Sequence, residues 1–237
     1  MTGQRKWFIP MAALALAASF GRVVLGDDLP RDLSRKYDAQ PLLALYAKEQ
    51  PQPKPVVLAD IDDTLMKFGT TDEVRFVLHL RSRNIKQLEG ASDAIRHLQQ
   101  NWNVVILTAR DDVFKEQTYR WLERQRFPSV PVVFSSKLRL TQRSQGDFKR
   151  QAIGQLKARG LRPAVGIGDS VADARAYLSS GMRAFIIIDD KKDEDFIRIS
   201  QDAKNDPKLK PYRDRLLFFE RNQPTPVWER IVEELKK

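Results

Sequence analysis

Two aspartates, Asp60 and Asp62, stand two residues apart directly after the apolar run Val56–Ala59. Ionised carboxylates this close repel each other unless a proton or a divalent cation lies between them. Magnesium is the natural cation, because it is a hard ion that prefers oxygen ligands. If the chain bends just after the apolar run, both side chains are aimed toward one pocket. An isolated Asp-x-Asp pair is common in surface loops, so the pair is informative only together with other motifs.

Further polar residues lie at the ends of apolar runs or beside an expected helix. Thr108 offers a hydroxyl, and with Ala109 it offers backbone N–H groups that could hold a phosphate oxygen, although a simple turn would look the same. Lys149 lies near the start of an expected helix, where a solvated lysine is equally ordinary. Asp169 ends an apolar run and Asp173 follows one turn into a helix. These two acids could complete a cation site, or they could simply be acids that the helix dipole favours.

The order of these segments resembles the motifs of the haloacid dehalogenase-like (HAD) superfamily over about residues 55–190. The motifs read DIDDT at 60–64, TAR at 108–110, Lys149, and GDSVAD at 168–173. The resemblance implies a Rossmann-like α/β fold, in which a parallel sheet carries helices on both faces. A small cap or none is expected, because few residues separate the motifs.

The same resemblance implies residue roles. Asp60 matches the nucleophile that forms an aspartyl-phosphate, and Asp62 matches the acid/base that protonates the leaving alcohol and then activates water. Dehalogenating members lack an acid at position 62, so a phosphatase is favoured. The implied cofactor is Mg²⁺, held by Asp60, the backbone carbonyl of Asp62 and Asp169. The implied phosphate-binding residues are Thr108, Ala109 and Lys149, and the supporting residues are Asp173, Thr64 and Arg110.

Within the superfamily, the motifs are nearest to those of the secreted bacterial class B acid phosphatases. Arg110 and an export signal contribute to this likeness, but the segment Leu65–Phe68 lacks the Ser-rich aromatic continuation of that class. A weaker likeness to polynucleotide 3′-phosphatases rests on Thr118, Trp121 and Leu122. Packing of a helix against the core explains those last residues more simply.

Composition bounds the chemistry further. The net charge of +10 and the pI of about 9.8 attract phosphoesters, nucleic acid or anionic lipid, although a basic surface can also serve only solubility. The chain has no cysteine, which excludes disulfides, thiolate nucleophiles and Cys-ligated zinc. With only His79 and His97 available, any catalytic scheme must rest on carboxylates.

The first 26 residues have the pattern of a signal peptide. Arg5 and Lys6 precede the apolar run Trp7–Phe20, and small residues lead to a possible cleavage point after Gly26. The run is short for a membrane span, which needs about 20 apolar residues. An uncleaved anchor and a buried helix are the alternatives. The expected location is periplasmic, extracellular or membrane-anchored.

Apolar runs alternating with helical patterns indicate a parallel sheet. Residues 27–54 are expected to form a helical lead-in and a Pro-rich linker, 55–190 the core, and 191–237 an extension docked on the core. Strands are expected at 56–59, 103–107, 130–134, 164–167 and 184–188. Helices are expected at 33–49, 92–100, 111–126, 147–158, 172–179 and 227–236.

The function expected from these features is an exported, acid-phosphatase-like, magnesium-dependent phosphomonoester hydrolase. The alternative is a catalytically silent HAD-fold module that binds phosphorylated lipid or nucleic acid through its basic surface. A phosphotransferase or mutase would use the same chemistry with another acceptor.

Overall fold

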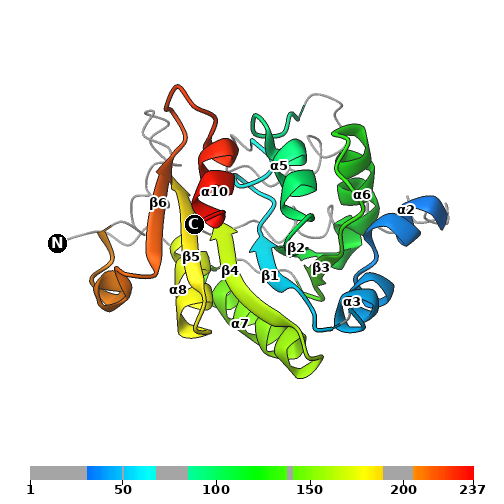
Figure 1. Cartoon of the computed structure of the whole chain (residues 1–237), viewed down its shortest axis with the longest axis horizontal. Helices are drawn as coiled ribbons and strands as arrows, with labels where there is room; N and C mark the ends of the chain where they lie inside the picture. The colour runs from blue at the N-terminus through cyan, green and yellow to red at the C-terminus, as the bar shows by residue number, and fades with distance from the viewer. Residues whose placement is uncertain (1–30, 50, 68–84, 138–140, 189–204) are drawn as a thin grey trace, which may run out of the picture.

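A parallel β-sheet forms the centre of the computed structural model, which describes residues 31–49, 51–67, 85–137, 141–188 and 205–237. Within these ranges six strands pair in the order β3-β2-β1-β4-β5-β6, and every pairing is parallel (Figure 1). They are β1 (Pro55–Ala59), β2 (Asn103–Asp111), β3 (Val132–Ser135), β4 (Arg162–Gly168), β5 (Arg183–Ile188) and β6 (Leu216–Glu220).

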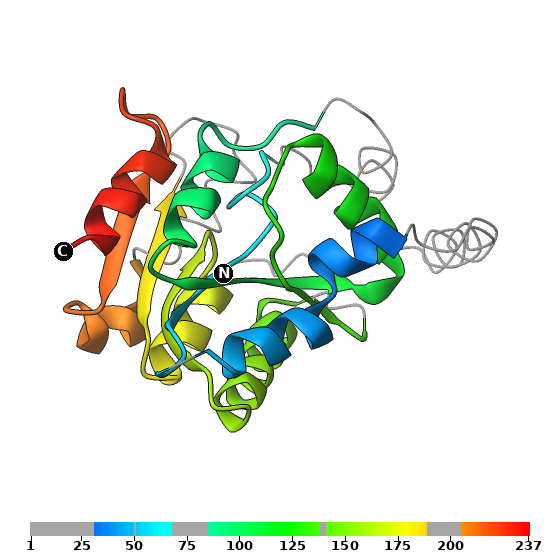
Figure 2. The same cartoon turned by 45° about the vertical axis from the view of Figure 1, so that its right-hand side comes forward.

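Helices cover both faces of this sheet (Figures 1 and 2). One face packs against α2 (Arg31–Tyr37), α5 (Ala91–Leu98), α6 (Lys115–Arg124) and α10 (Val227–Leu235). The other face packs against α3 (Ala39–Ala47), α7 (Gln142–Ala158) and α8 (Val171–Ser179). Two short 3-10 helices, η1 (Asp112–Phe114) and η2 (Pro207–Tyr212), complete the elements, with Phe114 packed on the first cluster and Leu209 buried in the second. The expected Rossmann-like α/β architecture, a parallel sheet with helices on both faces, is confirmed.

The apolar run of β1 is buried on both faces because helices cover both sides of the sheet at its centre, where β1 lies between β2 and β4. Val57 and Ala59 belong to the cluster on one face, whereas Val56 and Leu58 belong to the cluster on the other. All four are 0% exposed. A strand that is covered on both faces has a continuous apolar sequence, which explains why apolar and polar residues do not alternate there.

Two elements differ from the expectation in ways that matter for the site. Strand β2 continues to Asp111 instead of ending at Leu107, because Asp111 still pairs with Ser135 of β3 after a shift in register. Helix α7 starts five residues early, because Thr141 forms a capping box with Ser144. Thr108 therefore lies inside a strand, and Lys149 lies in the body of a helix rather than near its start.

Other boundaries differ at the two ends of the chain. The single helix expected at 33–49 is two helices, because Asp38 has an extended backbone and bridges to Val132. No strand was expected after residue 188, but β6 pairs in parallel with β5 and extends the sheet. The segment 1–26, His79 and residues 68–84, which lie between the first two motifs, are outside the described residues. The expectations of a signal peptide and of a small cap or none therefore stay open. No helix among the described residues is both long and apolar enough to cross a membrane.

Candidate active site

Asp60 follows the last residue of the central strand β1 and is 8% exposed. Its backbone N–H donates to the carbonyl of Ile167 in β4 at 2.9 Å, which fixes the end of β1 against its neighbour. Its Oδ2 lies 3.1 Å from the Nζ of Lys149. Its Oδ1 is buried and has no hydrogen-bond partner within the described part of the chain. A buried acceptor without a partner is costly, so this oxygen is suited to binding something else.

Three carboxylates meet at this carboxyl edge of the sheet. One oxygen from each of Asp60, Asp169 and Asp173 lies within 4.8 Å of the others. Asp169 directly follows β4, and Asp173 lies in the first turn of α8, where it is 0% exposed. Three carboxylates and an unpartnered oxygen fit a hard divalent cation such as Mg²⁺. The motif resemblance implied only a supporting role for Asp173, and it placed Asp62 among the ligands through its backbone carbonyl.

Asp173 is held by the helix that carries it. Ser170 caps α8, and its Oγ donates to the Oδ2 of Asp173 at 2.5 Å, while the N–H of Asp173 donates back to that Oγ at 3.2 Å. Gly168 makes room for this carboxylate, because a Cβ at position 168 would lie 2.4 Å from the Cγ of Asp173. The glycine of the GDSVAD motif is therefore a steric requirement of the cluster.

Lys149 links two of the buried acids. Its ammonium donates to the Oδ1 of Asp173 and pairs with Asp60, and its side chain is only 3% exposed. Burial alone would lower the pKa of Lys149, but the charges of Asp173 and Asp60 raise it well above its usual value. Lys149 is thus a fixed positive charge, and the phosphate-binding role implied by the motif resemblance stays a prediction.

Burial has the opposite effect on the acids. It raises the pKa of Asp60 to about 7, and the charges of Asp173 and Asp62 act in the same direction, whereas Lys149 opposes them. Desolvation likewise raises the pKa of Asp169 well above its usual value, with contributions from Asp173, Asp63 and Asp60. One lysine does not balance this many carboxylates, which is a second reason to expect a cation here.

Asp62 lies apart from the cluster's carboxylates and is paired with Arg110. The guanidinium donates from Nε to Oδ2 at 2.9 Å and from Nη2 to Oδ1 at 2.5 Å. Arg110 is itself buried, and its Nη1 donates to the Oγ1 of Thr118 at 3.0 Å. Its Nη2 also lies 3.3 Å from the sulfur of Met66. Arg110 therefore contacts the expected acid/base directly, which the sequence did not indicate.

The remaining expected site residues lie at the same edge of the sheet. Thr108 is fully buried in β2, and its Oγ1 accepts from the N–H of Arg110 at 3.3 Å, while Ala109 packs against the core. Thr64 is 0% exposed, and its Oγ1 has no hydrogen-bond partner among the described residues. The roles assigned to these residues stay predictions.

Some residues around the site were not anticipated. Tyr177 of α8 is buried against Gly166, donates to the carbonyl of Ile167 at 3.4 Å, and has its pKa raised by burial and by the charge of Asp173. Arg221 and Trp228 contact the backbone that follows Asp62. The glycine at 166, which leaves space for a ring, was the one local signal for Tyr177. No local pattern marks the other two.

Known proteins resemble this chain only at low sequence identity. No curated protein matches it. The solved structures that resemble it include D,D-heptose 1,7-bisphosphate phosphatase from B. bronchiseptica complexed with magnesium and phosphate (14% identity, 76% of this chain and 99% of that one, TM-score 0.47). Another is a haloacid dehalogenase-like hydrolase from Streptococcus pneumoniae (13% identity, 77% and 98%, TM-score 0.48). The nearer likeness to class B acid phosphatases stays a prediction.

A family model gives a more specific assignment. The model described as "PITM 1-3, LNS2 domain" matches residues 57–187. This range includes Asp60, Lys149 and Asp173, but it ends before β6 and α10. Because the match covers more than half of the chain, the protein belongs to the LNS2 domain family, whose fold is HAD-like.

Proposed function

We propose that this protein is a magnesium-dependent phosphomonoester hydrolase that works through an aspartyl-phosphate on Asp60. The observation that carries the proposal is the state of the Asp60 carboxylate. One of its oxygens is buried without a hydrogen-bond partner among the described residues, and the other faces Lys149 at 3.1 Å. A carboxylate in this state is suited to binding a metal and to attacking an electrophile.

The proposed reaction has two steps. An oxygen of Asp60 attacks the phosphorus, the bond from phosphorus to the ester oxygen breaks, and Asp62 gives its proton to the departing oxygen. Asp62 then takes a proton from water, whose oxygen attacks the phosphorus, and the bond from phosphorus to Asp60 breaks. Inorganic phosphate leaves, Asp60 is ionised again and Asp62 is protonated again.

Lys149 and Arg110 act on different groups in this reaction, Lys149 on the phosphoryl group and Arg110 on Asp62. Lys149 opposes the negative charge of the phosphoryl group, as does the backbone around Thr108 and Ala109. Arg110 donates one hydrogen bond to each oxygen of Asp62, which leaves a second lone pair on each oxygen for the proton. Arg110 thereby orients the carboxylate while it is ionised.

The carboxylates of Asp60 and Asp169, with Asp173 beside them and the backbone carbonyl of Asp62, are the groups that would hold magnesium. When bound, the ion neutralises charge, so that an anionic carboxylate can approach an anionic phosphate.

The direct test is release of phosphate from p-nitrophenyl phosphate and from a panel of phosphorylated metabolites, with magnesium and with chelator. We expect magnesium-dependent turnover that Asp60→Asn abolishes. In an acid-quenched reaction, Asp62→Asn is expected to accumulate one covalent phosphoryl group by mass spectrometry, which Asp60→Asn lacks. Equal turnover by the wild type and Asp60→Asn rejects the proposal.

A second candidate is a catalytically silent module that binds a phosphorylated lipid or nucleic acid. The observation that favours it is that both key acids are already paired with cations, Asp60 with Lys149 and Asp62 with Arg110. Its test is binding to vesicles that contain an anionic lipid and to nucleic acid over a range of salt concentrations. This candidate is supported if the wild type turns over no substrate of the panel and if binding persists in the Asp60→Asn, Asp62→Asn double variant.

Export is a separate part of the proposal. The segment 1–26 would direct the chain out of the cytoplasm, as a cleaved signal peptide or as an anchor. Expression of the full chain in a bacterial host, followed by fractionation and N-terminal sequencing, tests this. A product that stays in the cytoplasm with its first 26 residues intact contradicts it.

A further inference from the structure

The loop that carries Asp62 is a tight turn with an unusual backbone. The N–H groups of Thr64, Leu65 and Met66 all donate to the carbonyl of Ile61, at 3.3, 2.9 and 2.9 Å. Asp63 has a φ of 51°, in the left-handed region that L-residues rarely adopt. A strained turn of this kind persists only when surrounding structure holds it in place.

Arg221 supplies one such restraint from the other end of the chain. Its guanidinium donates from Nη2 to the carbonyl oxygen of Asp63, and its Nη1 lies 3.4 Å from the Oδ1 of the same residue. The two side chains are only 11% and 3% exposed. Arg221 is fixed in turn, because its own N–H donates at 2.8 Å to the carbonyl of Ile188, just beyond the last pair of the β5–β6 ladder.

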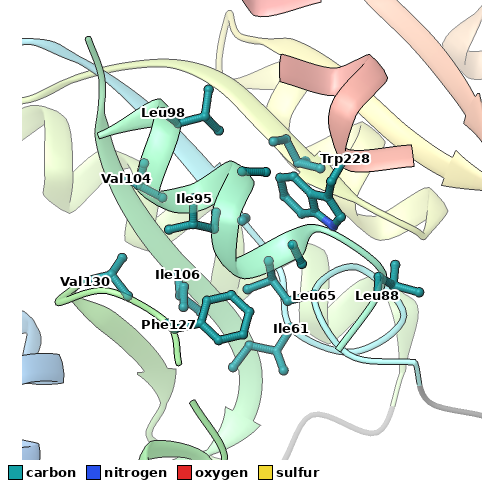
Figure 3. Packing of buried hydrophobic residues seen from close by; sticks show 14 of the residues in the cluster. Ile61, Leu65, Leu88, Ile95, Leu98, Val104, Ile106, Phe127, Val130 and Trp228 are labelled. Carbon is teal, nitrogen blue, oxygen red and sulfur yellow. The ribbon is translucent and has the colours of Figure 1, made fainter. Parts of the chain in front are cut away.

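Trp228 supplies the second restraint. Its Nε1 donates to the carbonyl of Thr64 at 2.9 Å, and the residue is 0% exposed. Figure 3 shows its indole reaching from α10 into the apolar cluster that includes Leu65 and Leu88. The ring is thus fixed by packing, and its N–H is fixed on the loop backbone.

Both restraints come from the C-terminal extension, which the sequence could assign no function. The matched family range ends at residue 187, whereas Arg221 and Trp228 lie beyond it. We propose that the C-terminal extension is a positioning element of the active site, in which Arg221 and Trp228 hold the backbone of Asp63 and Thr64 so that Asp62 stays aligned with Asp60. This inference rests on the proposed phosphatase activity for its effect on rate, but the contacts themselves can be tested without it.

The test uses Trp228→Phe, which keeps an aromatic ring and removes the N–H donor, and Arg221→Met with Arg221→Lys as the conservative variant. We expect kcat for p-nitrophenyl phosphate to fall about tenfold in Trp228→Phe and in Arg221→Met, because small displacements of catalytic groups are costly in rate. KM should change little, and Arg221→Lys should recover part of the loss. Hydrogen exchange measured by mass spectrometry should become faster in peptides that cover residues 60–66.

Tyr119→Phe is the matched control. Tyr119 is 0% exposed, and its hydroxyl donates to the carbonyl of Tyr37 at 3.2 Å, so the substitution keeps the ring and removes a buried bond to a main-chain carbonyl of α2 instead of the loop. Glu234→Gln is a second control, because it weakens the Arg183–Glu234 pair, which docks α10 on β5 away from the loop. Both controls should leave kcat and exchange in residues 60–66 unchanged, even where they lower the melting temperature.

The outcomes separate the two proposals. If Tyr119→Phe lowers kcat as much as Trp228→Phe at a similar melting temperature, or if exchange in residues 60–66 is unchanged in the Trp228 and Arg221 variants, the positioning role is wrong. If the wild type has no phosphatase activity, the proposed function fails. Faster exchange confined to residues 60–66 then still establishes that the extension holds this loop.

Discussion

Arg110 holds both carboxylate oxygens of Asp62, through Nε at 2.9 Å and through Nη2 at 2.5 Å. The arginine side chain is 3% exposed and that of Asp62 is 32% exposed, so a buried cation orients an acid that faces the open side of the site. Such two-point pairing fixes the direction of the carboxylate as well as its position. The effect of this pairing can be measured in the step in which Asp62 protonates the leaving group.

Arg110→Met is expected to slow the enzyme in a way that depends on the leaving group. Alkyl phosphates have poor leaving groups that need a proton, so kcat/KM for them should fall by about a hundredfold, the scale of general acid catalysis. The loss for p-nitrophenyl phosphate should be much smaller, because its leaving group departs without a proton. Thr118→Val, which removes a partner of Arg110, should show the same pattern more weakly. An equal loss for both substrates would mean that Arg110 acts elsewhere.

Lys149→Met should strongly destabilise the fold. Removing one partner of a buried ion pair leaves an uncompensated charge and costs about 3–5 kcal/mol in the free energy of unfolding. Asp173→Asn should also be costly, but the double variant should lose less than the sum of the two single changes. Urea denaturation without metal measures this. Additive losses would show that Lys149 and Asp173 do not interact as the structure indicates.

Gly168→Ala should disturb the acidic cluster through sterics alone. The new Cβ would lie 2.4 Å from the Cγ of Asp173, and relieving that overlap should cost about 1–3 kcal/mol in the free energy of unfolding. Gly154→Ala is the control, because a Cβ at position 154, inside α7, would have no atom within 4 Å. That change should stabilise the protein by up to about 1 kcal/mol. Similar thermal shifts in the two variants would contradict the tight contact.

The stabilisation by magnesium should grow with pH. Burial raises the pKa of Asp60 from 3.8 to about 7 in the metal-free fold, so the folded state binds this proton more tightly than the unfolded state does. By linkage, Asp60 favours folding most at acidic pH, and this contribution is lost as pH rises from about 4 to about 7. Magnesium must displace the proton, so its effect on the melting temperature should be small near pH 5 and larger near pH 8. Asp60→Asn should weaken this pH dependence and leave the part that comes from Asp169, whose pKa burial also raises, and thermal unfolding with and without magnesium checks it.

The sequence alone predicted the sheet and the composition of its functional edge. The apolar runs before Asp60 and Asp169 indicated buried parallel strands, and the carboxyl ends of such strands meet at one edge. That rule is enough to bring Asp60 and Asp169 to one edge, whereas the place of Lys149, which lies on helix α7, was implied only by the motif resemblance. Which residues lie at this edge does not depend on side-chain contacts between distant segments, because the direction of the strands and the local sequence after each strand determine it.

The tertiary structure decided which of these residues touch. It paired Asp62 with Arg110, 48 residues away, and placed the carboxylate of Asp173 in the acidic cluster. It also brought Arg221 and Trp228 to the backbone of the loop across separations of 158 and 164 residues. Contacts of this kind leave no periodic trace in the sequence, because each depends on how a sheet edge and a helix pack in space. Whether an apolar run such as Leu216–Glu220 becomes a strand is decided by the partner that it finds, here β5.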